Sequence, residues 1–337
     1  MVEVWLRYGK TEVFADIPSE ANTTIIQNEI TGRRFGEDIK RLVEENEHLI
    51  NLDNKVVMFI DYVAGLRGLD ELIQDTINVF MQLEKRLELV ISGWRYYSDK
   101  VEKELAAHVA HFAKHFTNVD RIITLREYDV GKYAKNAKVI VAPKMVWGYT
   151  ILGAEHFKKQ ILNPSGDILI IEANAARGEV KSINMEAEEE HDEAVAYLED
   201  KPDVIIISGD GYPTDNNLYS CMHIPASLYE VAEDCVIIFL AECGEGLGPS
   251  SFIQSLVSRR NNVESGDEVL EGWFKLVDVS KVCMVTALPA TYVERLLGAR
   301  HSDVVDDALT YAWRVKGRES KVVAIPQMLG TRLAIKS

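Results

Sequence analysis

The sequence predicts an α/β fold of two domains, each with a mostly parallel sheet, and an interdomain cleft that holds the ligand. Short apolar runs of strand type alternate with segments of helical periodicity along the chain. Several of these runs end in glycine or charged residues, at the edge where such sheets bind ligands. The 337 residues also exceed what one core usually supports. We place the boundary near Glu199–Pro202, which gives domains of residues 1–200 and 201–337.

The amino-terminal half begins with a predicted hairpin. Gly9 and Lys10 separate two runs of alternating polarity and form its turn. We then expect strands over 56–62, 87–92, 122–125 and 139–141, and helices over 69–83, 98–116 and 154–162. An antiparallel pair over 167–173 and 180–185 and an acidic helix over 187–198 follow.

The carboxy-terminal half repeats the alternation of strand and helix. Strands are expected over 204–208, 236–241, 282–287 and 321–325, and helices near 214–231, 250–260, 290–298 and 302–316. Pro225 lies inside the first of these helices, so we expect a kink or break there.

Composition limits the kinds of partner. The formal net charge is -16, which disfavours nucleic acid and anionic membranes but leaves room for a small anionic metabolite. The four cysteines form no C-x-x-C pair and are expected to be reduced, which indicates a cytoplasmic protein. The first residues lack a signal-peptide layout, and no apolar run approaches the roughly 20 residues that span a bilayer.

Two glycine-rich stretches follow predicted strands. In "SGDGYPTDNNLY", which begins at Ser208, Gly209 and Gly211 allow positive φ and close backbone approach. Thr214 or Asp215 can cap the next helix, whose free N–H groups favour an anion. A simple strand-to-helix turn explains the same residues equally well. The second stretch, "AECGEGLG", lacks the spacing of a dinucleotide fingerprint.

Other charged residues are open to two interpretations. Asp61, Arg95 and Lys144 stand at predicted strand ends, which makes them site candidates by topology. His108, His111 and His115 share one helix face and either hold a divalent metal or form a solvated histidine face; they are three of the eight histidines. His191, in an acidic run, and the pair Arg259 and Arg260 are either exposed or contact a ligand.

The two glycine-rich stretches together resemble the carboxy-terminal domain of the nickel-dependent lactate racemase family. The resemblance rests on a first run (Gly209, Gly211-Tyr212-Pro213, Asp215, Asn217-Leu218-Tyr219) and a second (Glu242-Cys243, Glu245-Gly246). The later "VTALPATYVERLLGAR" and "SKVVAIPQM" fit the closing strand-helix-strand pattern. The amino-terminal half is similar more loosely.

The resemblance implies a chemistry and a set of residues. The family racemises 2-hydroxy acids with a nickel pincer nucleotide that is bound to a lysine, a histidine that completes nickel coordination, and two acid/base histidines. It points to Lys158 or Lys159, with Lys144 as a further candidate, for the cofactor lysine and to His156 for nickel. The cofactor-binding set would be Gly209, Gly211, Tyr212, Asp215, Glu245 and Gly246, and the catalytic set Lys144, Arg95 and Asp61.

The sequence departs from the family where the chemistry is done. Trp94 stands in place of one acid/base histidine, Lys144 takes the place of the other, and Val63-Ala64-Gly65 replace a threonine-arginine-proline run. Two functions therefore stay open. One is a racemase or epimerase of a 2-hydroxy acid. The other is a family member that lost the cofactor and binds a small anionic metabolite or partner without turnover. Cofactor-free chemistry such as dehydration has no positive indication, and homo-oligomerisation is left open.

Overall fold

A computed structural model describes residues 1–26, 34–50, 54–93, 99–127, 137–147, 150–152, 168–183, 195–260 and 268–336. The chain forms two compact α/β units. The first consists of Met1–Glu29, Val146–Thr150 and Asp192–Ser337, and the second of Ile30–Met145 and Ile151–His191. The amino-terminal hairpin thus belongs with the carboxy-terminal half, whereas a boundary near residue 200 assigns it to the other domain.

The first unit is built on a parallel sheet with the strand order β15-β14-β13-β12-β16-β3. These strands are β3 (Asn22–Ile25), β12 (Val204–Ser208), β13 (Val236–Leu240), β14 (Lys281–Val285), β15 (Arg300–Ser302) and β16 (Lys321–Ile325). Every residue of β12 and β13 is buried, as expected of central parallel strands. The order of strand addition reverses between β12 and β16, which is where open α/β sheets bind ligands.

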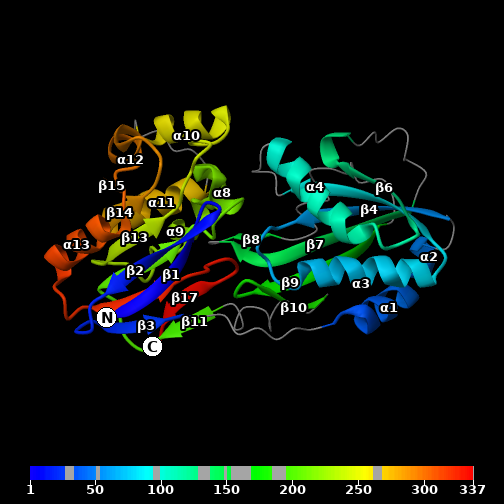
Figure 1. Cartoon of the computed structure of the whole chain (residues 1–337), viewed down its shortest axis with the longest axis horizontal. Helices are drawn as coiled ribbons and strands as arrows, with labels where there is room; N and C mark the ends of the chain where they lie inside the picture. The colour runs from blue at the N-terminus through cyan, green and yellow to red at the C-terminus, as the bar shows by residue number, and fades with distance from the viewer. Residues whose placement is uncertain are drawn as a thin grey trace. The chain divides into compact units, whose positions relative to one another are not determined.

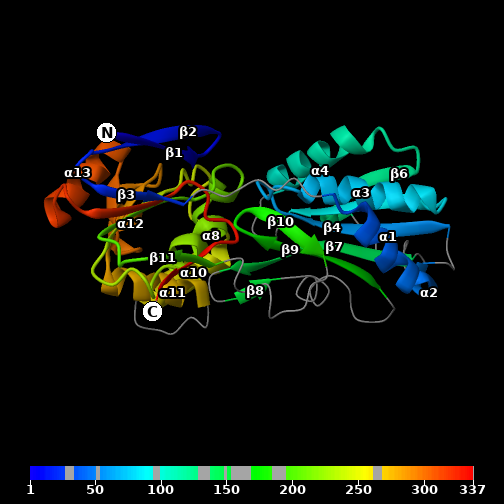
Figure 2. The same cartoon turned by 90° about the horizontal axis from the view of Figure 1, so that it is seen from below.

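One face of this sheet is covered by the hairpin and one helix. The hairpin of β1 (Val2–Tyr8) and β2 (Thr11–Ile17) was predicted by the alternating pattern and is confirmed. Its inward side chains, among them Leu6 and Ile17, pack with those of α13 (Val305–Lys316) against Ile206 and Ile238 of the sheet. Figure 2 shows β1, β2 and α13 together on this side.

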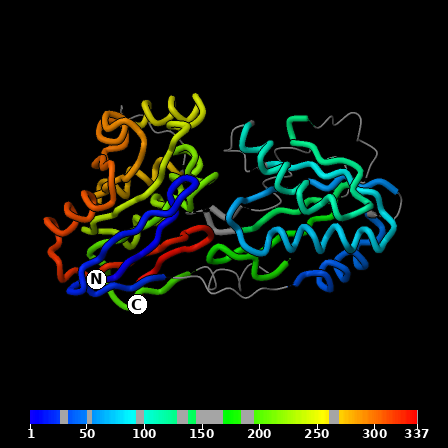
Figure 3. Tube along the Cα trace, in the orientation of Figure 1, coloured from blue at the N-terminus to red at the C-terminus, as the bar shows by residue number. Residues whose placement is uncertain are grey.

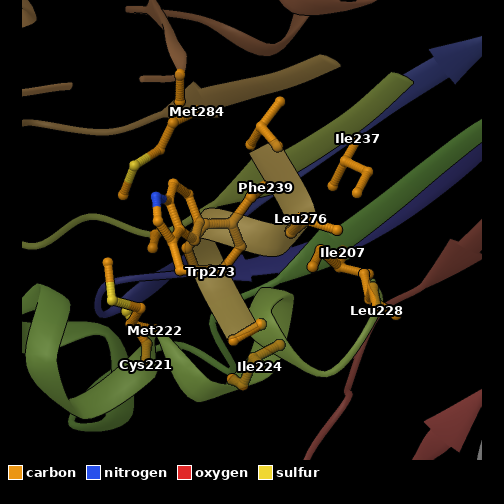
Figure 4. Packing of buried hydrophobic residues seen from close by; sticks show 14 of the residues in the cluster. Ile207, Cys221, Met222, Ile224, Leu228, Ile237, Phe239, Trp273, Leu276 and Met284 are labelled. Atoms are coloured by element: carbon orange, nitrogen blue, oxygen red, sulfur yellow. The ribbon is translucent and has the colours of Figure 1, made fainter. Parts of the chain in front are cut away.

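The opposite face carries a larger apolar core beneath α11 (Glu268–Val279), with α10 (Ser250–Arg260) and α12 (Ala290–Arg295). Trp273 of α11 is fully buried, and its indole Nε1 donates a hydrogen bond to the carbonyl oxygen of Leu297 at 2.9 Å. Figure 4 shows this indole among Phe239, Met284 and neighbouring apolar side chains. α11 was not predicted from the sequence.

Two predicted helices differ in the structure. In place of one helix over 214–231 there are η2 (Thr214–Asn216), α8 (Leu218–Cys221) and α9 (His223–Ala226). Extended backbone at Asn217 interrupts the helix, so Pro225 is not the first break. The end of the predicted acidic helix is wrong as well: Val195–Leu198 form strand β11, parallel to β17 (Arg332–Ile335). Residues 187–194 lie outside the described residues.

The second unit has a mostly parallel sheet with the order β10-β9-β7-β4-β5-β6, and β8 pairs with β7. Its strands are β4 (Lys55–Tyr62), β5 (Arg86–Gly93), β6 (Val119–Thr124), β7 (Ala137–Trp147), β8 (Thr150–Leu152), β9 (Leu169–Ala176) and β10 (Glu179–Ile183). The helical segments are α1 (Gly36–Glu45), α2 (Glu47–Ile50), α3 (Leu69–Gln82), α4 (Asp99–Ala113) and η1 (Leu125–Glu127). The antiparallel pair β9–β10 is confirmed.

Helices α3 and α4 lie on one face of this sheet (Figure 1). The predicted strands and these two helices are confirmed, with shifts of a few residues at their ends. β7 is the exception, because it continues to Trp147. Lys144 therefore lies within a strand and not after one. The predicted helix over 154–162 falls outside the described residues, and no helix in the described part of the chain is long and apolar enough to cross a membrane.

Candidate functional site

The carboxylate of Asp215 lies at the carboxyl edge of the first unit's sheet. Its Oδ2 accepts hydrogen bonds from the backbone nitrogen of Gly9 at 2.7 Å and from that of Glu242 at 3.1 Å. The side chain is fully buried. One carboxylate thus ties together the hairpin turn, the loop after β12 and the loop after β13.

The hairpin turn is fixed to the β12 loop at further points. The nitrogen of Tyr212 donates to the carbonyl oxygen of Gly9 at 2.7 Å, and the ammonium of Lys10 lies 4.2 Å from the centroid of the Tyr212 ring. Gly9 has a φ of +54°, and a Cβ there would lie 2.0 Å from Oε2 of Glu242. Figure 3 traces the blue hairpin to this turn. Only glycine fits at this position without movement of a neighbour.

The loops after β12 and β13 are joined by backbone hydrogen bonds. The nitrogen of Cys243 donates to the carbonyl oxygen of Asp215 at 2.8 Å, and that of Glu245 donates to Asn216 at 2.8 Å. A Cβ on Gly209 would lie 3.0 Å from the Cβ of Asp215, which shows how closely the backbones approach. The structure therefore brings together six of the predicted residues, namely Gly209, Gly211, Tyr212, Asp215, Glu245 and Gly246.

Asp210 lies at the reversal of strand order between β12 and β16. Its Oδ1 accepts a hydrogen bond from the nitrogen of Met328, which follows β16, at 2.8 Å. Its Oδ2 has no hydrogen-bond partner among the described residues. Burial raises the pKa of Asp210 to about 7, although that bond to Met328 acts in the opposite direction.

Two further groups at this edge, Asp215 and Tyr8, also have raised pKa values. Burial also raises the pKa of Asp215 to about 6, with a further contribution from the charge of Glu242. Burial, followed by the charge of Glu242, raises the pKa of Tyr8 to about 12. Clusters of carboxyl groups with perturbed pKa values are typical of sites that move protons, although structural networks produce them too.

Helix N-termini do not offer free amides here. The helical segments after β12 are three to four residues long. The nitrogen of Ser220 is capped by Oδ1 of Asn217 at 3.0 Å, and the nitrogen of Asp215 donates to the carbonyl oxygen of Gly211 at 3.0 Å. The amides of Gly9 and Glu242 are taken by Asp215 itself. A cofactor-binding role for the six residues stays a prediction.

Two of the three predicted catalytic residues, Lys144 and Asp61, are described, and both lie in the second unit. The ammonium of Lys144 in β7 lies 3.7 Å from Oε2 of Glu172 in the neighbouring strand β9. Asp61 is the second-last residue of β4, opposite Ser92 of β5. The other predicted residues of this half, Arg95, His156, Lys158, Lys159 and His191, lie outside the described residues, as does Trp94.

The three-histidine metal site does not form. His115 lies beyond the end of α4, and all three side chains are exposed. His108 instead directs Nε2 toward Oδ2 of Asp70 at 2.9 Å, while Oδ1 of Asp70 accepts a hydrogen bond from the hydroxyl of Tyr62 at 2.8 Å. Among the described residues, no group of three or more His, Cys, Asp or Glu side chains is placed to hold a metal ion.

Sequence reasoning missed several of these contacts. Tyr62, Asp70 and His108 come from β4, α3 and α4, so no spacing within one segment predicts that their side chains meet. The same is true of Asp210 and of the thiols of Cys221 and Cys243, whose Sγ atoms are 4.0 Å apart. Arg259, in contrast, is paired with Glu271 at 2.9 Å, which favours a structural role for it.

Comparison with known proteins agrees with this architecture. Residues 197–331 match the lactate racemase C-terminal domain, the segment that carries Asp215 and both glycine-rich loops. This carboxy-terminal segment therefore belongs to the lactate racemase C-terminal domain family. The solved structure of the lactate racemase apoprotein from Thermoanaerobacterium thermosaccharolyticum aligns with a TM-score of 0.64 and 14% identity, over 99% of this chain and 100% of that one. No curated protein matches the sequence.

The lactate-racemase fold therefore extends over both units, while the family match is confined to the carboxy-terminal domain. The α/β architecture and the family predicted from the glycine-rich loops are confirmed. At 14% identity the likeness to the solved apoprotein concerns the fold and not the reaction.

Proposed function

We propose that this protein is a lactate-racemase-like isomerase that binds a small 2-hydroxy acid and inverts the configuration at its C2 carbon. The match of residues 197–331 to the lactate racemase C-terminal domain is the observation that carries the proposal. A small anionic metabolite as ligand and a cytoplasmic location belong to the same proposal.

Inversion at C2 requires that hydrogen leave one face of the carbon and return to the other. The hydroxyl proton must be taken by a base as the hydrogen leaves. Lys144 is the described residue best suited to the task. Its side chain is 17% exposed, and its nitrogen lies 3.7 Å from Oε2 of Glu172, which can relay a proton. Asp61 and Arg95 would help to hold the substrate.

The nickel pincer nucleotide of the family would act as the hydride acceptor when bound. The residues that the resemblance assigns to it, Lys158 or Lys159 and His156, lie outside the described residues. The described residues contain no donor set for nickel. The use of this cofactor by the present chain stays a proposal.

The test is a racemisation assay with D- and L-lactate and longer 2-hydroxy acids, followed by chiral chromatography. The protein is produced with and without the enzymes that assemble the pincer nucleotide. We expect conversion in one of the two preparations and its loss in Lys144→Met. Lys138→Met, a partly exposed lysine of the same strand, should leave conversion unchanged. Absence of conversion with every acid, together with an intact mass free of any adduct, contradicts the proposal.

The second candidate function is binding without turnover. The presence of Trp94 at the position of a family histidine favours it, because an indole cannot act as the base, and the ammonium of Lys144 is already engaged by Glu172. It predicts that a 2-hydroxy acid raises the melting temperature by preferential binding to the folded state, without conversion. Isomerisation of any 2-hydroxy acid contradicts this second candidate.

A further inference from the structure

Two cysteines of the first unit lie side by side at the edge of its sheet. The Sγ atoms of Cys221 and Cys243 are 4.0 Å apart, and their side chains are 0% and 2% exposed. Cys221 ends α8, and Cys243 follows β13. Figure 4 shows Cys221 at the margin of the apolar core beside Met222. All four cysteines are free thiols.

The backbone already holds these two thiols together. The nitrogen of Leu218 donates to the carbonyl oxygen of Gly246 at 3.0 Å, and that of Tyr219 donates to Leu247 at 3.2 Å. With the bond from Cys243 to Asp215, these contacts fix α8 against the loop that carries Cys243. A disulfide needs an S–S distance of about 2.05 Å. The sulfurs must therefore approach by roughly 2 Å, which side-chain rotation and a small loop movement can supply.

Cys243 occupies a backbone conformation that usually selects glycine. Its φ is +52°, in the left-handed region, although glycines follow at positions 244 and 246. A non-glycine residue in this strained conformation points to a role for its side chain. The thiol of Cys221 donates to the carbonyl oxygen of Asn217 at 3.5 Å, and that of Cys235 donates to Pro202 at the shorter distance of 2.9 Å.

We propose that Cys221 and Cys243 are a redox-modification site, a dithiol that hydrogen peroxide converts to a disulfide. The peroxide oxygen is first transferred to the sulfur of Cys243, which becomes a sulfenic acid as one water leaves. The sulfur of Cys221 then attacks the sulfenic sulfur, the S–S bond forms, and a second water leaves. The two thiols lose two electrons and two protons, and the peroxide gains them.

The order of these steps follows from exposure. Gly244 and Glu245 beside Cys243 are exposed, so this loop is the part through which an oxidant enters. Burial raises the pKa of the Cys221 thiol well above its usual value, and the neighbouring Cys243 adds to this effect. Cys221 is therefore the less readily oxidised of the two thiols and reacts second, and its proton leaves with the sulfenic oxygen as water when its sulfur attacks. Oxidation should be slow because it waits for the loop to open.

The disulfide would fasten the segment after Asp215 to the loop after Glu242. It would add a covalent bond between two segments that hydrogen bonds now hold together, and so oppose local unfolding at this edge of the sheet. This disulfide does not depend on the isomerase activity, because intact mass and peptide mapping detect the S–S bond directly.

The experiment treats the native, reduced protein with hydrogen peroxide and follows intact mass, then maps disulfides by peptide digestion without reductant. We expect a loss of two hydrogen masses, one link between Cys221 and Cys243, and free thiols at Cys235 and Cys283. The melting temperature should rise on the order of 5 °C and fall back when a thiol reductant is added. Cys283→Ala should still form the link, whereas Cys221→Ala should not.

Since the mapping uses the native sequence, the proposal remains testable if a variant fails to fold. Three outcomes would overturn it: an unchanged mass after prolonged exposure, a link that includes Cys235 or Cys283, or oxygen addition at Cys243 as the final product.

Discussion

The backbone nitrogen of Gly9 lies 2.7 Å from Oδ2 of Asp215, although 206 residues separate the two along the chain. The same oxygen accepts the nitrogen of Glu242, so a single buried carboxylate links three separate segments. Around it the glycines are required by space: both Gly9 and Gly211 have positive φ and close neighbours.

Gly9→Ala should destabilise the first unit by about 1–3 kcal/mol, because the new Cβ meets the Glu242 carboxylate and the backbone is left-handed. The loss of unfolding free energy should be smaller in a Glu242→Ala background, where only the backbone strain remains. Thermal unfolding of the four proteins in this double-mutant cycle measures the difference. Gly317→Ala is the control for strain alone, since its φ is +86° and a Cβ there would have no neighbouring atom within 4 Å. Equal costs in both backgrounds would count against the contact.

Asp210→Asn should flatten the dependence of stability on pH. The folded pKa of Asp210 is raised to about 7, so the native state holds the proton more tightly than the unfolded chain. Stability from this group is fully present below pH 4 and is lost as pH rises through about 7, by up to roughly 4 kcal/mol. The variant should therefore match the natural protein at pH 4 and be more stable at pH 8.

Melting temperatures from pH 4 to pH 8 test this expectation. Asp234→Asn is the control that should leave the profile between pH 4 and pH 8 unchanged, because Lys316 lowers the pKa of that exposed carboxyl below its usual value. There, stability is present above the unfolded pKa and is lost as pH falls. An Asp210→Asn protein that is less stable than the natural one at pH 8 would show that the ionised carboxylate is needed.

The contacts of Asp70 should differ in strength. Tyr62 is buried and its hydroxyl donates to Asp70 at 2.8 Å, whereas His108 is half exposed. Double-mutant cycles should give a coupling free energy of about 1 kcal/mol for Tyr62 with Asp70. For His108 with Asp70 we expect at most about 0.5 kcal/mol, because solvent screens exposed pairs. The reverse ranking in unfolding measurements would indicate that His108 is held by more than this contact.

Trp273→Phe should destabilise the first unit by about 2–4 kcal/mol, because it leaves a void in the core and removes the hydrogen bond to Leu297. Trp313→Phe, at a partly buried position of α13, should cost less than about 1 kcal/mol. Chemical denaturation followed by tryptophan fluorescence compares them. Similar losses in the two variants would mean that the core beneath α11 repacks.

The central strands were predictable because each is a short, continuous apolar run, as in β12 and β13. α11 was missed although its apolar face has helical spacing, and the helix over 214–231 failed because capping by Asn217 is a local choice. Edge strands such as β3 carry ordinary polar residues, so only their pairing with β16 identifies them.

The candidate site was predictable where glycine marks a close approach, as at Gly209 and Gly211. The sequence does not reveal which side chains and segments approach these glycines. The hairpin turn, Asp210 and the thiol pair lie far apart in the chain and meet only in the folded unit. Lys144 was placed after a strand because Pro143 suggested an end, yet β7 continues through both residues.

The hairpin covers the sheet of a half that is synthesised much later. Residues 1–26 leave the ribosome well before strands β12 to β16, which follow roughly 200 residues behind, a delay of about 10–40 s at usual rates of translation. Through that interval the alternating apolar face of β1 and β2 has no sheet to cover. A fragment of residues 197–331 produced alone would lack this cover in turn, and would leave Ile206 and Ile238 open to solvent and prone to aggregate. Any recombinant version of this half should therefore carry the first 26 residues, either fused or supplied as a peptide.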